Sequence, residues 1–331
     1  MSTNPATWMA DNLASFGALK LNQLVMPASH DSAMYEVSDC TTVAGVGANA
    51  CSTQTQTNDI QGQLTQGSRY FDVRPVMYNS SLVTGHYSST SSLALGCNGP
   101  SLSDYLGQVA AFMQGSGELV ILKFSHYFDR DAGSGFSYSD FQALVNSVRA
   151  TLSDYMYTTP GAPGALSAQT LNAYIGDGTG KVLCVFDSLP ADLLDPTRGL
   201  FSYADFPGSG DLVVFDEYAD QHKLSKMETD QKTKLADTGN HQGNLFLLSW
   251  TLTQSDTYAA ECAVGIDSHS ILNLAATAND ALQSTMADWV SDGTITPATI
   301  PNLIYVDANA SFSLDTALYL NTQLAAMGVA G

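Results

Sequence analysis

The sequence has few basic residues, and this scarcity excludes several classes of protein. Its 331 residues include 12 Lys and Arg against 32 Asp and Glu, a formal net charge of −20. Nucleic-acid binding depends on clustered Lys and Arg, so no nucleic-acid partner is expected. An anionic membrane would repel such a chain, so any contact with a membrane surface should be local and transient. Among so few cations, Arg74 and Lys123 stand out because each lies in an apolar, strand-like context.

Long apolar runs are also missing. No stretch approaches the roughly 20 consecutive apolar residues of a membrane-spanning helix. The N-terminal residues show no cationic segment followed by an apolar one, so no signal peptide is visible. Abundant Ser, Thr, Asn and Gln with little Lys nevertheless resembles exported microbial proteins. We therefore expect a secreted, monomeric protein.

Cysteine is scarce, and its spacing excludes the common zinc sites. The five cysteines form no C-x-x-C pair and no other zinc-ligand spacing. Cys40 and Cys51 flank a loop of small residues and could be bridged in an exported protein. Cys184 and Cys262 are expected to be buried apolar residues. Because the count is odd, at least one thiol should be free.

Short apolar runs alternate with amphipathic helical patterns along the whole chain. Several runs are nearly continuous in Val, Leu, Ile and Phe, which is typical of strands buried on both faces. Helical patterns begin near residues 101, 139, 270 and 314. The expected strands are 24–26, 70–74, 82–85, 119–123, 181–187, 212–216, 245–250 and 303–307. This alternation, without a linker, predicts one α/β domain over 1–331, a TIM-type (β/α)8 barrel that is irregular between strands 2 and 3.

Charged residues gather at the carboxyl ends of these expected strands, where barrel enzymes build their active sites. Charged residues commonly end strands, but eight of them on one rim are notable in a chain with 13% charged residues. They are His30, Asp72, Arg74, His86, Lys123, Asp187, Asp216 and Asp307. The remaining histidines have no motif around them and are expected to be surface or structural residues: His126, His222, His241 and His269.

Two histidines and an arginine form a minimal set for breaking a phosphodiester. The reaction needs a base on one side and an acid on the other, and imidazole titrates near neutral pH. A planar guanidinium matches the geometry of phosphate, and a carboxylate can orient each histidine. The structural alternatives are that Asp31 caps a helix and that Arg74 only forms an ion pair with Asp72.

Three motifs resemble the X region of bacterial phosphatidylinositol-specific phospholipases C. Residues 27–32 are PASHDS, residues 67–74 are GSRYFDVR, and residues 86–87 are HY. Weaker matches follow at 119–123, 181–186, 215–218 and 303–307, so the resemblance covers nearly the whole chain. It implies a phospholipase C that releases diacylglycerol and a 1,2-cyclic inositol phosphate.

The resemblance also implies roles for individual residues. His30 would be the general base that deprotonates the inositol 2-hydroxyl, oriented by Asp307. His86 would be the general acid that protonates the leaving diacylglycerol oxygen, with Asp31 as its partner. Arg74 would bind the non-bridging phosphate oxygens, and Asp72 would support the cluster from below.

Headgroup binding follows from the same resemblance, with one departure. Lys123 and Asp216 would hydrogen-bond inositol hydroxyls, and Tyr218 would stack on the ring. The family usually carries an arginine where Asp187 stands here. A carboxylate still accepts hydrogen bonds from hydroxyls, but it disfavours further phosphates on the ring. The segment 199–206, rich in aromatics, could insert into the lipid interface or simply pack against the barrel.

Calcium-dependent relatives carry an Asn after the first histidine and a carboxylate where Arg74 stands. A guanidinium there would repel the ion, so no cofactor is expected and calcium is disfavoured, with Asp31 and Asp72 forming at most a partial site. Two groups of alternatives remain. One is a metal-dependent phosphodiesterase on the same barrel: a calcium-dependent phospholipase C, a glycerophosphodiesterase or a sphingomyelinase-like lipase. The other is non-catalytic: an inositol- or lipid-binding module, or a structural surface protein.

Overall fold

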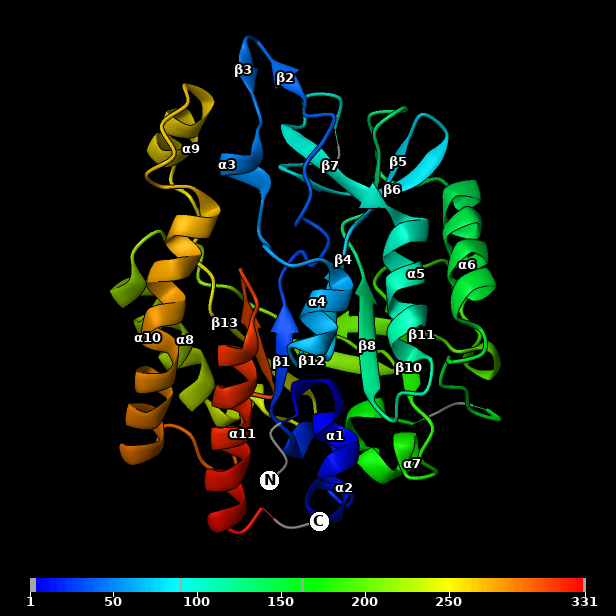
Figure 1. The fold of residues 1–331 in the computed structure, drawn as a ribbon, viewed down its shortest axis with the longest axis vertical. Helices are drawn as coiled ribbons and strands as arrows, with labels where there is room; N and C mark the ends of the chain where they lie inside the picture. The colour runs from blue at the N-terminus through cyan, green and yellow to red at the C-terminus, as the bar shows by residue number, and fades with distance from the viewer. Residues whose placement is uncertain (1–3, 90, 162–163, 330–331) are drawn as a thin grey trace.

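Eight parallel strands close into a barrel in the order β1-β14-β13-β12-β11-β10-β8-β4 (Figure 1). The computed structural model describes residues 4–89, 91–161 and 164–329. All neighbouring strand pairs of the barrel run parallel. The strands are β1 (Met26–Ser29), β4 (Tyr70–Val73), β8 (Leu119–Phe124), β10 (Lys181–Phe186), β11 (Leu200–Asp205), β12 (Leu212–Phe215), β13 (Leu245–Ser249) and β14 (Leu303–Val306). The predicted TIM-type barrel is confirmed.

One expected strand is not part of the barrel. Residues 82–85 lie in β6 (Ser81–Tyr87), which pairs antiparallel with β5 (Pro75–Tyr78) and β7 (Gly96–Ser101). Asn79 and Ser80 join β5 to β6 with positive φ angles of 49° and 58°, the backbone of a tight hairpin that folds β6 back on β5. With β9 (Phe128–Asp129), these strands form a side sheet of order β7-β6-β5-β9 above the barrel (Figure 1). The irregularity between the second and third strands is this insertion.

The barrel position left open is taken by β11, and the expectation that 199–206 inserts aromatics into a membrane is wrong. Gly199, in the left-handed region with φ 79°, turns the chain into this strand. Phe201 and Tyr203 are buried in the core cluster that fills the barrel. Alternation with period two points both rings inward, so the alternative of packing against the barrel holds.

Helices surround the barrel where the periodicity predicts them. The predicted helices correspond to α5 (Leu102–Met113), α6 (Tyr138–Leu152), α10 (Ile271–Ser291) and α11 (Ser311–Ala326). Serine side chains at 101, 137 and 270 cap the first three of these helices. Residues 187–211, all of them described, contain no α-helix between β10 and β12. None of the helices in the described ranges has the length and apolar content of a membrane span.

The remaining elements are short, apart from α8. The other α-helices are α1 (Trp8–Asp11), α2 (Leu13–Phe16), α3 (Ala50–Thr53), α4 (Ile60–Thr65), α7 (Leu171–Ile175), α8 (Leu224–Ala236) and α9 (Asp256–Ala263). The 3-10 helices are η1 (Pro5–Thr7), η2 (Leu21–Gln23), η3 (Leu166–Ala168), η4 (Pro196–Arg198) and η5 (Thr238–Asn240). A hairpin of β2 (Thr42–Val43) and β3 (Val46–Gly47) stands above the barrel near α9 (Figure 1).

Two disulfides hold this upper region, and they differ from the pairing that the sequence suggested. Cys40 bonds Cys97 of β7, and Cys51 of α3 bonds Cys262 of α9. The proposed Cys40–Cys51 bridge is therefore wrong, and Cys262 is not a free apolar residue. The β2–β3 hairpin intervenes between Cys40 and Cys51, and each pairs instead with a segment distant in sequence. Cys184, buried in β10, is the free thiol that the odd count requires.

Candidate active site

His30 and Asp307 meet because their strands are parallel neighbours. Ser29 pairs with Val306 in the β1–β14 register, so the next residue of each strand emerges at the same point of the rim. His30 Nδ1 lies 2.6 Å from Asp307 Oδ1. The Asp307 side chain is 3% exposed, while that of His30 is 19% exposed. The pair therefore has a buried carboxylate behind an imidazole that faces the open end of the barrel.

Arg74 links this pair to two further carboxylates. Its Nε donates to Asp72 Oδ2 at 2.9 Å, and its Nη1 lies 3.3 Å from Asp31 Oδ2. Its Nη2 lies 2.9 Å from His30 Nε2. A guanidinium only donates, so Nε2 accepts this hydrogen bond and the proton of neutral His30 resides on Nδ1, facing Asp307. The lone pair of His30 Nε2 is therefore the basic site at the centre of the cluster.

His86 enters the cluster from the side sheet. Its Nδ1 lies 2.6 Å from Asp31 Oδ2, and Asp31 is fully buried. Asp31 reaches this position with a left-handed φ of 39°, directly after His30. The His86 side chain is 23% exposed. Each histidine thus has its own carboxylate on Nδ1 and turns its other nitrogen toward the open site.

Asp72 is the buried anion beneath the cluster. Its Oδ2 accepts from the Tyr305 hydroxyl at 2.8 Å, and its Oδ1 accepts from the Ser125 hydroxyl at 3.1 Å. Burial alone would raise the pKa of Asp72, but the charges of Arg74 and Lys123 hold it well below the ordinary value. Sequence reasoning missed Tyr305 and Ser125. The period-two spacing of Tyr305 from Asp307 was the available signal.

The pKa of His30 results from opposing effects. Burial would lower it, but the Asp307 carboxylate raises it, and the net direction is upward from 6.5. The positive charge of Arg74 acts in the opposite direction from Asp307. Protonation of Nε2 would also cost the hydrogen bond from Arg74. The Asp307 carboxylate thus makes His30 a stronger base than its burial alone would allow, as a general base requires.

The residues predicted to hold the headgroup lie on the other side of the barrel mouth. Lys123 Nζ donates to Asp216 Oδ2 at 3.0 Å, and the Tyr203 hydroxyl donates to the same oxygen at 2.9 Å. Lys123 Nζ also lies 4.7 Å from the centre of the Tyr203 ring. Asp187 accepts from its neighbour Ser188 at 2.8 Å, and Tyr218 is 62% exposed. The structure thus joins Lys123 to Asp216, adds Tyr203, and leaves Asp187 and Tyr218 at the edge.

His126 is a second omission of the sequence reading. It follows β8 with a left-handed φ of 56° and an exposed side chain. The charge of Arg74 lowers the pKa of His126 to about 4. A neutral imidazole therefore stands beside the guanidinium. Its position just past a barrel strand was the only signal in the sequence.

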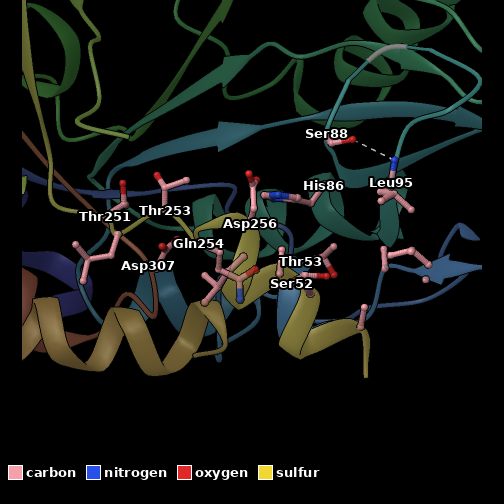
Figure 2. A pocket seen from close by; sticks show the side chains of 18 of the residues that line it. Ser52, Thr53, His86, Ser88, Leu95, Thr251, Thr253, Gln254, Asp256 and Asp307 are labelled. Carbon is pink, nitrogen blue, oxygen red and sulfur yellow. Dashed lines mark hydrogen bonds between the residues drawn. The ribbon is translucent and has the colours of Figure 1, made fainter. Parts of the chain in front are cut away.

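A cavity of about 500 Å³ opens beside the two histidines (Figure 2). His30, His86 and Asp307 are among the residues that line it. Much of the remaining wall is apolar and comes from β3, α9 and the start of α10. Among the described residues, no group of three or more His, Cys, Asp or Glu side chains is placed to hold a metal ion.

Comparisons with known proteins agree with this fold. The chain is similar to solved phosphatidylinositol-specific phospholipases C from Staphylococcus aureus, at 18% identity and a TM-score of 0.61, and from Listeria monocytogenes, at 17% identity and a TM-score of 0.61. Each alignment covers 96% of this chain and 98% of the other. The chain thus has the fold of these phospholipases C, as its sequence resemblance implies.

One curated protein is also similar in sequence. It is a PI-PLC X-box domain-containing protein from Dictyostelium discoideum, 25% identical over 191 residues, which is 55% of this chain. The match spans 23% of that protein's length. No family model matches the chain.

Proposed function

We propose that this protein is a phosphatidylinositol-specific phospholipase C that acts by general acid–base catalysis. The observation that carries the proposal is the arrangement of His30, Arg74 and His86, with a separate carboxylate on Nδ1 of each histidine. Two oriented imidazoles on either side of a guanidinium suit in-line displacement at a phosphodiester. The fold shared with two phospholipases C supports the same reaction.

In the first step, His30 Nε2 takes the proton of the inositol 2-hydroxyl while that oxygen bonds to phosphorus. The bond from phosphorus to the glycerol oxygen breaks, and His86 Nε2 gives its proton to that oxygen. The products are diacylglycerol and the 1,2-cyclic phosphodiester. Asp307 and Asp31 stabilise the charged form of His30 and His86, respectively. The enzyme can open the cyclic product with water when the histidines exchange roles.

Arg74 binds the non-bridging oxygens in this proposal. Its Nη2 donates to His30 Nε2 without substrate, so a phosphate that accepts this N–H would also release the lone pair of the base. Asp72 holds Nε and fixes the plane of the guanidinium. Binding of the phosphate and activation of His30 are thereby coupled through one side chain.

The headgroup proposal assigns the inositol ring to the side of Lys123 and Asp216. Both present polar atoms at the barrel mouth, and Asp187 and Tyr218 lie farther out, where they can contact ring hydroxyls and the ring face. The carboxylate of Asp187 disfavours rings with additional phosphates. Unphosphorylated phosphatidylinositol is therefore the proposed substrate.

We further propose that no metal takes part and that the protein works outside the cell as a monomer. Arg74 puts its positive charge between Asp31 and Asp72, the carboxylates that would otherwise attract a cation. Two disulfides suit an oxidising compartment. Its contact with a membrane would be transient, because a net charge of −20 opposes binding to anionic lipid.

Phosphorus NMR of the protein with phosphatidylinositol in neutral detergent micelles tests the reaction. We expect a cyclic phosphodiester resonance early and a phosphomonoester later. His30→Ala and His86→Ala should each slow the first step at least about 100-fold. His222→Ala, which alters a histidine outside the cluster, should not slow it. Direct formation of the monoester, with no cyclic species, would overturn the proposed role of the inositol 2-hydroxyl.

A further inference from the structure

The cavity beside the histidines lies away from the predicted headgroup residues. His30, His86 and Asp307 are among its lining residues, and Figure 2 labels the last two. Among the described residues that line it, none belongs to β8, β10 or β12 or to the headgroup set of Lys123, Asp187, Asp216 and Tyr218. It is instead lined by Asp307, which directly follows β14, by the segment that follows β13, and by α9. The site therefore has two sides, one polar and one mainly apolar.

The outer wall of the cavity is suited to hydrocarbon. Of the described residues that line it, the charged ones other than the two histidines are Asp307 and Asp256, and none is a Lys or Arg. A second phosphate or an acidic peptide would find no cation there. Its volume of about 500 Å³ is within the range of small-molecule sites. The apolar side chains of the wall are Val46, Ala48, Leu95, Leu252, Ala259, Ala260, Ala263 and Ile271.

A disulfide and several hydrogen bonds fix the positions of the cavity walls relative to one another. The Cys51–Cys262 disulfide ties α3 to α9, and Asn49 Nδ2 donates to the Cys262 carbonyl at 2.9 Å. Gln254 Nε2 donates to the Cys51 carbonyl at 3.1 Å and to the His269 carbonyl at 2.7 Å. These bonds connect elements on both sides of the cavity. An apolar cavity braced in this way is pre-formed, which lowers the cost of binding a ligand.

The second disulfide connects the cavity to the proposed general acid. His86 pairs with Cys97 in the β6–β7 register, and Cys97 is bonded to Cys40 just before the β2–β3 hairpin. Val46 and Gly47 of that hairpin line the cavity. The chain that carries His86 and the hairpin that forms the outer wall are therefore fixed to one another.

We propose that this cavity binds the hydrocarbon part of the leaving alcohol, so that the enzyme holds at least part of a lipid chain within the protein during cleavage. The inference rests on the proposed function, because it takes His86 as the acid that protonates the leaving oxygen. A group attached to that oxygen is next to His86, one of the residues that line the cavity. The apolar walls then receive the chain that leads away from it.

Water-soluble esters of inositol 1-phosphate with methyl, butyl, hexyl and octyl alcohols test the proposal below their micelle concentrations. Each methylene buried in the cavity should raise kcat/KM about fourfold until the cavity is full. Ala260→Trp places a large ring in the cavity from an exposed helical position, and it should abolish the rise in kcat/KM from the methyl to the octyl ester. Thr257→Trp, at an exposed α9 position outside the lining, is the matched control and should keep the full chain-length dependence.

Binding of the alcohol product separates the two proposals. Calorimetry with monomeric dihexanoylglycerol should give a dissociation constant at least about tenfold larger for Ala260→Trp than for the parent and Thr257→Trp, because the ring occupies the space of the chain. If no ester is cleaved but the alcohol binds in this way, the proposed function fails and the lipid cavity stands. Esters cleaved at rates independent of chain length, a dependence retained in Ala260→Trp, or no binding of the alcohol would each overturn the cavity proposal.

Discussion

Arg69 and Arg74 lie at opposite ends of the same barrel strand, β4, and have different partners. Arg69 is fully buried at the amino end, where Nε and Nη2 contact Glu118 at 2.9 and 2.8 Å. Its Nη1 and Nη2 also donate to four backbone carbonyls, of Pro5, Ala6, Leu64 and Ser68. Arg74, at the carboxyl end, contacts only side chains in the described structure, and its own side chain is 14% exposed. Strand β4 is thus flanked by one arginine that is fully buried among fixed partners and by one whose guanidinium is partly exposed.

The difference shows what makes a buried arginine available for chemistry. Every side-chain nitrogen of Arg69 donates to Glu118 or to a backbone carbonyl, and a ligand cannot displace these acceptors. Arg69 therefore has no N–H group available for a ligand. Arg74 donates one N–H to His30 Nε2, an acceptor that a phosphate oxygen can replace. Barrels use the two ends in the same way: the amino end for stability and the carboxyl end for reactions. The predictions below test whether these two roles are separable in this chain.

Removal of Arg69 should have the largest effect, and it should be on stability. Arg69→Met leaves the buried Glu118 carboxylate without a cation, which costs about 3–5 kcal/mol in the free energy of unfolding. Urea denaturation followed by fluorescence measures this loss. The folded fraction should keep the parent rate of phosphodiester cleavage. A variant of unchanged stability with reduced kcat would contradict the division of roles.

Arg74→Lys should produce the converse result. The charge between Asp31 and Asp72 remains, so the free energy of unfolding should change little. The flat pair of N–H donors is lost, and the cleavage rate should fall about 10²- to 10³-fold. The initial rate of cyclic phosphate formation measures this effect, and Arg69→Lys is the matched control at the other end of the strand. A rate within about tenfold of the parent would mean that only the charge of Arg74 matters.

A smaller effect is expected from the carboxylate behind the base. Asp307→Asn removes the charge that raises the pKa of His30, so that pKa should decrease. In the parent, kcat/KM should fall as the pH drops below the raised pKa, because His30 becomes protonated. In the variant this acidic limb should move to lower pH, with a loss of rate of about 10- to 100-fold as orientation is lost. Asp187→Asn, which does not contact His30, should leave the limb in place.

The sequence predicts the rim of this site better than its surroundings, for a physical reason. The family resemblance implies the pairing of His30 with Asp307, and the parallel register of β1 and β14 accounts for it, because residues that follow neighbouring strands emerge together. The exchange of β6 for β11 in the barrel is not visible in the apolar runs, because both segments have suitable composition. The disulfides depend on how long loops fold above the barrel, and local periodicity does not encode such distant contacts. Tyr305, in contrast, was accessible from its period-two spacing to Asp307 in a strand that the sequence predicts.

The smallest expected effect is that of metal ions, and it tests whether Arg74 neutralises the phosphate without one. If Arg74 itself neutralises the phosphate, EDTA should change the initial rate of phosphatidylinositol cleavage by less than about twofold, and added calcium should not raise it. The guanidinium lies 2.9 Å from Asp72 and 3.3 Å from Asp31, so a divalent cation at these carboxylates would have to displace it or bear its repulsion. Loss of activity in EDTA with recovery in calcium, but not in magnesium, would show that the carboxylates act through an ion. Arg74 would then be a structural cation like Arg69, and the two ends of β4 would no longer differ in kind.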